Sequence, residues 1–433
     1  MWKNKIVFMS LLALATCGLA QQPLPLNKAI EMALANSYEL QISQSELRTA
    51  ELQDFRGNAG ETPRPSFGVS DNVQVNNVAQ DLANGTSINR NGAFANALGA
   101  NLQVNWTIFN GMRVSAIKQR IREQIVGQGE LHKAQINATM ANVMQSYYAI
   151  VRQQYYLAVI ARTREVSRLR KELAEQKKEA GLANASDVLL AELDLSEREQ
   201  AYKTQELYLR QSMMDLAALV NDVPGSTYVL TDTAFPQIGL DRAEIMDKLQ
   251  DNPELLAAEA AIRASEQSER SAYATRMPTV GLSSGLAYNL SYNTGGFVTS
   301  AQSYGPFIGV NANVPLLQNK IFNRQYDIAR QQTETTRLRL AQAADNLETA
   351  ALKLWESYVY AQAQAELEAM NVENARRYLD LVTERHRLNA ATAIDLREAQ
   401  RSYEDANFRQ IDVQYQAINA EIELMRLAGM LVR

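Results

Sequence analysis

The feature of this sequence that most limits its fold is a long stretch without glycine or proline. Neither residue occurs between Pro315 and Gly429 in the 433-residue chain. Both residues interrupt regular structure, glycine through its conformational freedom and proline through its fixed backbone and missing N–H. The stretch therefore predicts very long helices. The first, expected from Asn319 to about Leu388, would be roughly 100 Å long at a rise of about 1.5 Å per residue.

Apolar residues and alanines recur every seven positions in the predicted helices, which indicates paired, supercoiled helices. Two such series are Leu340, Leu347, Leu354 and Ala361, and Ile136, Val143, Ile150 and Leu157. On the helices alone, the chain would be a long antiparallel coiled coil that serves as a structural spacer.

Composition and motifs exclude several classes of function. The chain has 43 basic and 48 acidic residues, for a net charge of −5, whereas nucleic-acid-binding proteins normally present a basic face. It contains no GxxxxGK[ST] or GxGxxG phosphate-binding motif, and His132 and His386 have no clustered partners that would make a metal site. No nucleophile–base–acid constellation is evident. The sequence thus predicts a protein that is not an enzyme and uses no cofactor.

The N-terminus has the three parts of a secretion signal. Two lysines precede an apolar run over 6–15, and small residues lead to a cleavage site after Ala20. The sequence therefore predicts export, with residues 1–20 removed as a signal peptide. A second interpretation is a lipoprotein signal in which Cys17, the single cysteine, becomes acylated. Simple cleavage is the preferred prediction, because Thr16 fits poorly before a lipidated cysteine.

Three segments show the alternation of a β-strand, and none of them carries a charge. They cover about 98–109, 279–292 and 305–317. In each segment, apolar residues alternate with small polar ones, which places the two kinds on opposite faces. A fourth segment, over about 66–78, alternates less cleanly because Asp71 falls on its apolar face. Each is long enough to cross a bilayer at a tilt, which takes about 9–11 residues.

An apolar face opposite a small, uncharged polar face indicates a membrane barrel with lipid outside and water inside. A soluble sheet, the alternative, would be expected to carry lysine, glutamate and arginine on its wet face. Four strands cannot close a pore, and an open sheet edge is not tolerated in lipid. The sequence thus predicts an oligomeric barrel to which each copy contributes four strands, most simply with cyclic symmetry.

The chain also contains an internal two-fold repeat at an offset of 208 residues, at which Asp187-Val188-Leu189 corresponds to Asp395-Leu396-Arg397. Each half is predicted to contain a helix, two strands and a long helical hairpin. The predicted divisions are 21–221 for the first repeat, 222–247 for a linker and 248–433 for the second repeat, with hairpin tips near 181–187 and 388–395.

Several motifs in these segments carry a family resemblance. They are the opening LPLNKAIEMALANSYEL, the strand-to-helix junctions ending IFNG and LLQN, and the hairpin tips GLANASDVLLAE and LNAATAIDLREAQ. Together with the duplication, they make the whole mature chain resemble the TolC-like outer-membrane efflux family. The resemblance implies a mixed all-α and transmembrane-β fold. In it, a homotrimeric, twelve-stranded outer-membrane β-barrel with four strands per chain is continuous with a long periplasmic α-helical barrel. The linker at 222–247 and the termini would belt the helices.

The resemblance also implies a function. The chain would be a passive exit duct in the bacterial outer membrane that extends into the periplasm. It would contact outer-membrane lipid, bind no nucleic acid, and dock with a periplasmic adaptor and an inner-membrane transporter, either proton-driven or of the ABC type. One alternative is the outer-membrane component of a type I protein-secretion system. A less favoured alternative is a structural periplasmic coiled-coil protein.

At the hairpin tips, the resemblance assigns roles to four residues. Asp395 and Glu398 match the family's acidic pair, and in a trimer they would ring the periplasmic aperture and favour cations. The competing interpretation is an ordinary helix start, where acidic residues suit the helix dipole. Asp187 occupies the position of a linking acid, and His386 stands in place of its tyrosine partner. A gate link between these two is therefore a further expectation.

Overall fold

The computed structural model describes residues 22–83, 85–223, 225–226, 228–236, 239–316 and 320–431. The predicted signal peptide, with Cys17, lies outside the described residues, as does most of the LLQN junction. The chain divides into two compact units, here called the sheet unit (46–129 and 257–341) and the helical unit (the remainder). Each unit draws on both sequence repeats. The linker predicted at 222–247 therefore separates the repeats in sequence but does not separate the compact units.

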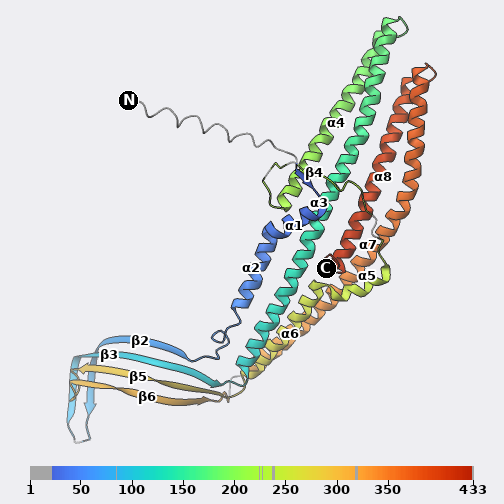
Figure 1. Ribbon diagram of the computed structural model, residues 1–433. Coiled ribbons are helices and arrows are strands. Elements are labelled where there is room, and N and C mark those ends of the chain that lie inside the picture. Colours follow the sequence, from blue (N-terminus) through green and yellow to red (C-terminus); the bar gives the residue numbers. More distant parts are fainter. Residues whose placement is uncertain are drawn as a thin grey trace, which may run out of the picture. The chain divides into compact units, whose positions relative to one another are not determined.

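The sheet unit contains four antiparallel strands in the order β2, β3, β5, β6 (Figure 1). Their bounds are β2 Arg64–Asp81, β3 Ser87–Phe109, β5 Thr279–Asn293 and β6 Ser300–Asn313. The first hairpin is much longer than its predicted strands, because its ladder continues to the pair Asp81 and Ser87. Most of residues 79–97, between the two predicted strands, is therefore strand. Strand β6 begins five residues earlier than expected, because Ser300 pairs with Tyr292, and ends at Asn313, two residues before Pro315, rather than near 317.

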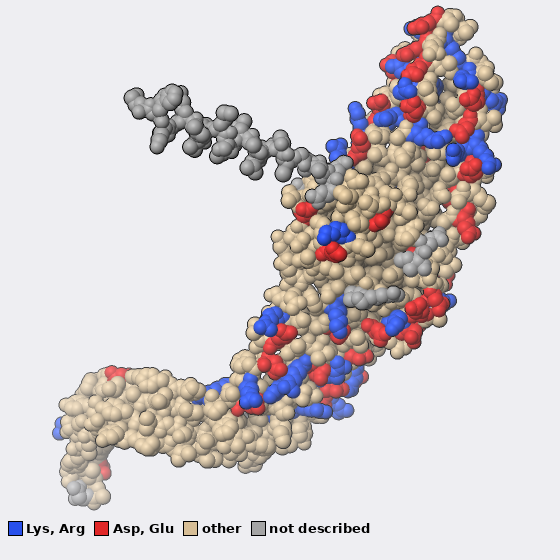
Figure 2. Space-filling model, in the orientation of Figure 1, with Lys and Arg blue, Asp and Glu red and all other residues tan. Residues whose placement is uncertain are grey.

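The strand register puts the apolar residues of all four strands on one face, called here the apolar face. Neighbours across the ladders include Phe67 with Leu102, Trp106 with Leu282, and Ser284 with Ile308. These side chains are open to the surroundings, with Phe67 at 72% and Ile308 at 76% exposure. Figure 2 shows that charged side chains are sparse over the strands. A large exposed apolar surface of this kind marks a membrane or protein contact.

Asp71 stays on the apolar face, opposite Leu98, and the pairing passes it without a break. A hydrogen bond from the Asn96 amide to its carboxylate, at 2.7 Å, supplies a partner there. The register shift of this hairpin comes later, between Asn76 and Val78. A bulge is therefore not what accommodates Asp71.

The helices repeat at the offset seen in the sequence. Helix α3 (Arg113–Glu179) and helix α7 (Ile321–Arg387) are both 67 residues long, and α4 (Ala185–Leu219) and α8 (Ala393–Leu427) are both 35. Each pair starts and ends 208 positions apart. The shorter helices α2 (Tyr38–Leu52) and α6 (Pro253–Ala274) precede the two sheet hairpins. In the described part of the chain, no helix combines the length and the apolar character needed to cross a membrane.

In the helical unit, α3 and α8 lie between α4 and α7 (Figure 1). The main core packs α3 residues such as Val143, Tyr147 and Ile150 against Leu216 of α4 and Ile422 of α8. A small belt covers this core. Its elements are β1 (Gln22–Leu24), which pairs in parallel with β4 (Tyr228–Leu230), and the helices α1 (Leu26–Asn36) and α5 (Arg242–Lys248), the last followed by a 3₁₀ turn at Leu249–Asp251.

Tyr147 fastens two segments of the belt to α3. Its side chain is fully buried, and its hydroxyl donates to the Leu24 carbonyl at 3.0 Å while accepting from the Asp232 N–H at 3.2 Å. Backbone groups buried without partners are costly, so this hydroxyl serves both the N-terminal strand and the linker.

We expect Tyr147→Phe to lower the stability of the helical unit by about 1–3 kcal/mol, because it leaves the buried Leu24 carbonyl and the part-buried Asp232 N–H without this partner. The midpoint of heat-induced unfolding, followed by circular dichroism, measures this change. Tyr38→Phe, at an exposed position of α2, is the control and should leave the midpoint in place. An unchanged midpoint for Tyr147→Phe would contradict the proposed role of its hydroxyl.

Candidate functional site

The two long hairpins end in equivalent tips. At the first, Gly181 takes a positive φ of 75°, and at the second, Asn389 takes a φ of 59°. Glycine and asparagine tolerate this left-handed conformation better than other residues do. This conformation ends the incoming helix, so the chain reverses its direction within five residues at each tip.

An aspartate at the third helical position completes a capping box at the start of the outgoing helix at each tip. Asp187 forms a capping box with Asn184, whose N–H donates to the carboxylate at 3.1 Å and whose side-chain oxygen accepts from the Asp187 N–H at 3.0 Å. Asp395 forms the same arrangement with Thr392, accepting from its N–H and its hydroxyl at 2.8 Å each. Both aspartates therefore stabilise helix starts, the competing interpretation for Asp395.

The hydrogen bonds also fix the charge of Asp395. The N–H and then the hydroxyl of Thr392 hold the pKa of this exposed carboxyl below its usual range. Asp395 therefore keeps its negative charge to a lower pH than an ordinary aspartate. Glu398, three residues further along α8, is also exposed. The two carboxylates are available to a passing solute or a partner.

Asp187 and His386 line the same hollow of about 270 Å³ between the tips. Each has its partner within its own tip, however, since Asp187 caps α4 and the His386 Nδ1–H donates to the Ala391 carbonyl at 3.0 Å. A different contact joins the tips, in which the Lys177 ammonium donates to the Asn389 side chain. Sequence reasoning missed this contact, because both residues read as ordinary exposed residues.

About two helical turns from the tips, an ionic cluster joins the two hairpins. Asp194 of α4 contacts Arg170 of α3 and, at 3.2 Å, Arg397 of α8. The side chain of Arg170 is only 4% exposed and that of Asp194 only 14%. Burial, and then the nearby Arg397 charge, lower the pKa of Arg170. Asp194 is therefore the negative charge that compensates the buried Arg170, while the half-exposed Arg397 contacts the same carboxylate from α8.

A second polar group lies one to two helical turns away. Glu404 of α8 accepts from the Thr163 hydroxyl of α3 and from Arg198 of α4. Gln400 donates to the Thr163 carbonyl at 3.3 Å and to the Ser167 hydroxyl at 3.1 Å. The two groups hold α8 against both helices of the first hairpin. Their sequence signal was weak, because helices are rich in charged residues and only burial distinguishes these.

Comparison with known proteins assigns the architecture. The sequence profile of the family described as outer membrane efflux protein matches residues 245–430. Protein CyaE of Bordetella pertussis is 24% identical over 330 residues, which is 74% of this chain and 67% of that protein. Among solved structures, the CmeC outer membrane channel of Campylobacter jejuni superimposes with a TM-score of 0.75 at 14% identity, covering 94% of this chain and 85% of CmeC. The outer membrane protein VceC of Vibrio cholerae gives 0.72 at 18%, covering 93% and 96%.

The chain is related to the outer membrane efflux proteins. This confirms the family recognised from the sequence motifs. An outer membrane efflux protein is a channel in the outer membrane that extends into the periplasm, so the predicted localisation and the prediction of a non-enzymatic function are also confirmed. Among the described residues, no group of three or more histidine, cysteine or carboxylate side chains could hold a metal ion.

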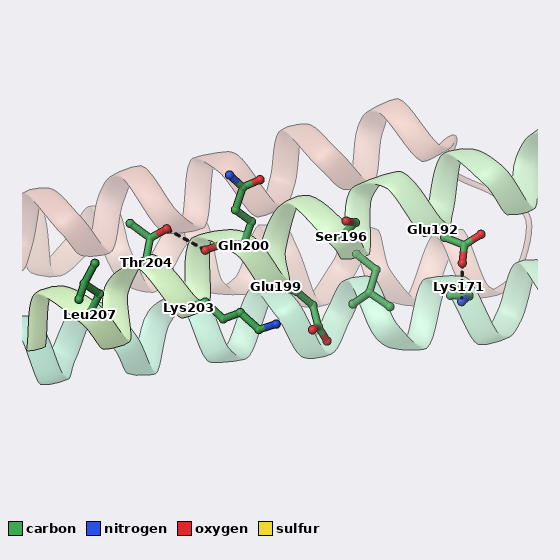
Figure 3. Close-up of a pocket in the computed structure, with 9 residues that line it drawn as sticks. Lys171, Glu192, Ser196, Glu199, Gln200, Lys203, Thr204 and Leu207 are labelled. Atoms are coloured by element: carbon green, nitrogen blue, oxygen red, sulfur yellow. Dashed lines mark hydrogen bonds and ion pairs between the residues drawn. The ribbon is translucent and has the colours of Figure 1, made fainter. Parts of the chain in front are cut away.

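The outer helix α4 carries an open groove of about 630 Å³ against α3 (Figure 3). A Lys171–Glu192 ion pair, at 3.2 Å, stands at one end of it, and the Thr204 hydroxyl, which donates to the Gln200 carbonyl, stands near the other. The lining mixes both charges with the apolar Leu195 and Leu207. It has the character of a helix flank that contacts another helix rather than of a small-molecule site.

We expect Asp194→Asn to destabilise the junction of the hairpins by about 3–5 kcal/mol, because it leaves the buried Arg170 charge without its partner. Limited proteolysis of the tips, together with the heat-unfolding midpoint, measures this effect. Glu192→Gln removes a carboxylate from the exposed Lys171–Glu192 pair and is the matched control, with little change expected. Equal behaviour of the two variants would contradict the assigned role of Asp194.

Proposed function

We propose that this outer membrane efflux protein works as a homotrimeric exit duct. Three copies form a twelve-stranded barrel in the outer membrane and a helical barrel in the periplasm. The observation that carries the proposal is the four-stranded sheet, whose apolar face is exposed and whose two outer strands, β2 and β6, are 18 and 14 residues long. A sheet with these edges is incomplete as a membrane structure.

The sheet edges supply the physical reason for assembly. Each outer strand presents a row of backbone N–H and C=O groups, and hydrocarbon offers no partner for them. Pairing β2 of one copy with β6 of the next satisfies every edge once the ring closes. The number three follows from the family resemblance, which gives four strands per chain in a barrel of twelve.

The outer helices α4 and α7 each expose a stripe of apolar side chains. Helix α8 buries 13 of its residues, whereas the outer helices α4 and α7 keep large apolar side chains exposed. Those on α4 include Leu189, Leu193, Leu207 and Tyr208, and those on α7 include Tyr360, Leu367, Tyr378 and Leu381. Packing α7 of one copy on α4 of the next would bury both stripes and close the helical barrel.

In this assembly the second tips, with Asp395 and Glu398, ring the periplasmic aperture. Asp187 and His386 remain candidates for the gate, although in one chain they do not bond each other. An adaptor protein and a proton-driven or ABC inner-membrane transporter supply the cargo and the energy, because a water-filled duct needs neither nucleotide nor cofactor. The favoured role is efflux. The similarity to protein CyaE supports the alternative, the outer-membrane component of a type I protein-secretion system.

The assembly predicts that the exposed stripe of α7 is buried between copies. Leu367→Glu combined with Leu381→Glu places two charges in that interface, and the detergent-extracted trimer should dissociate to monomers. Sedimentation or light scattering of the membrane extract gives the mass. Glu356→Gln combined with Glu366→Gln, at exposed positions of the same helix, should leave the trimer intact. A wild-type product that is monomeric and soluble in water would refute the architecture.

The aperture assignment predicts cation selectivity that depends on the tip carboxylates. Asp395→Asn combined with Glu398→Gln should remove most of the selectivity in planar bilayers, along with block by a trivalent cation added on the periplasmic side. The Glu356 and Glu366 pair again provides the charge-matched control. Because Thr392 lowers the pKa of Asp395, wild-type selectivity should persist to acid pH, and Thr392→Ala should shift its loss to higher pH. Wild-type selectivity in the double tip variant would show these residues to be helix caps only.

A further inference from the structure

The sheet face opposite the apolar face, called here the polar face, is built mainly from small uncharged residues. It presents glycine, alanine, serine, threonine, asparagine and glutamine along the described strands, together with Phe307 of β6, which lies opposite Gly285. Its regular ladder carries a charge only at Arg64, at the end of β2. In the proposed duct this face lines the lumen. A neutral wall of this kind neither attracts nor repels a charged solute.

Asparagine and glycine form a repeated cross-strand pattern on the polar face. Three of its asparagines lie directly opposite a glycine on the neighbouring strand, one pair in each ladder of the sheet. The pairs are Gly68 with Asn101, Gly99 with Asn289, and Gly281 with Asn311.

In two of these pairs the amide occupies the space that a side chain on the glycine would need. A Cβ atom built on Gly68 would lie 2.5 Å from Oδ1 of Asn101, and one built on Gly281 would lie 2.7 Å from Oδ1 of Asn311. Both distances are shorter than any stable contact. In the third pair the corresponding distance is an ordinary 3.6 Å.

Conformational freedom is not the reason for these glycines. Neither Gly68 nor Gly281 has a positive φ, so an L-residue could adopt the same backbone. What the missing side chain provides is room for the neighbouring amide to lie over the strand. With a methyl group there, the flexible amide would have to swing away from the wall, toward the lumen.

We infer that Gly68 and Gly281 set the clearance of the membrane section of this duct. By letting Asn101 and Asn311 lie along the wall, they keep the lumen at its full width, with a neutral, hydrated lining. Such a section passes bulky hydrated cargo of either charge, including an extended polypeptide, and leaves discrimination by charge to other parts of the duct. The inference rests on the proposed function, because it requires the polar face to line a pore.

Polymer exclusion in planar bilayers tests the inference. Neutral polyethylene glycols of increasing size are added on the extracellular side, and the smallest polymer that no longer lowers the conductance marks the free width. Gly68→Ala combined with Gly281→Ala should shift this cut-off to smaller polymers, because six amides per trimer would project into the lumen. Adding Asn101→Ala and Asn311→Ala to that variant should restore the wild-type cut-off.

Gly305 provides the matched control. It lies on the polar face opposite Ala287, and a Cβ atom built there meets nothing within 4 Å. Gly305→Ala should therefore leave the cut-off unchanged, and Gly99→Ala should shift it less than the other two glycines do.

The outcomes separate this inference from the proposed function. An unshifted cut-off in a double variant that still forms trimers would overturn the inference alone, as would a shift that the asparagine substitutions fail to reverse. If the double variant does not assemble, Gly68→Ala alone is compared with the same variant carrying Asn101→Ala. Wild-type protein that forms no pore at all would instead refute the proposed function.

Discussion

Everything in this chain depends on the need of backbone polar groups for hydrogen-bond partners. In the helices each N–H finds a carbonyl one turn back, so helices of 67 residues extend without outside help. In the sheet the partners come from neighbouring strands, and the outer strands β2 and β6 have none on one side. The apolar face of the same strands suits lipid, where those unpaired groups cannot remain. The sheet therefore needs strands from further copies to pair its edges. The helices need no such partner for their backbone groups, although further copies would bury their exposed apolar side chains.

The duplication explains how one chain forms both the sheet and the long helices. Each repeat contributes two strands and one long helical hairpin, and the hairpins match in length and in their tips. The match extends to single residues, because Asp187 and Asp395 cap equivalent helices. The copies differ where they meet each other. Asp194 and Arg397 lie on corresponding helices at positions that do not correspond, and their contact crosses between the repeats. The duplication thus sets the order and length of the elements, and contacts that are not duplicated hold the two repeats together.

The proposed aperture and the proposed lumen of the membrane section differ in charge. The second tip carries the exposed carboxylates Asp395 and Glu398, which we propose favour cations, whereas the polar face of the sheet is nearly free of charge. Inside the helical unit, the charged side chains of Asp194 and Glu404 are paired with arginines. A duct built this way would discriminate at its periplasmic end and remain permissive in the membrane.

The sequence by itself determined the element types, because periodicity and glycine or proline placement are local properties. The absence of both residues after Pro315 gave the long helices. The alternation over 98–109 predicted a strand with one apolar face, and the offset of 208 predicted the repeat. Strand bounds were less predictable. The stretch after 76 looks like a loop by composition, yet it continues the ladder because its partner strand does.

Only the tertiary structure decided which polar residues act together. Asp187 and His386 were expected to bond, but Asp187 finds a nearer partner in Asn184 and His386 in the Ala391 carbonyl. Arg170 and Asp194 resemble dozens of other charged helix residues until packing buries them. The glycines opposite asparagines are unremarkable in sequence as well, because only the register aligns residues from separate strands. Local spacing fixes what an element is, whereas burial and partners depend on distant segments that sequence spacing does not reveal.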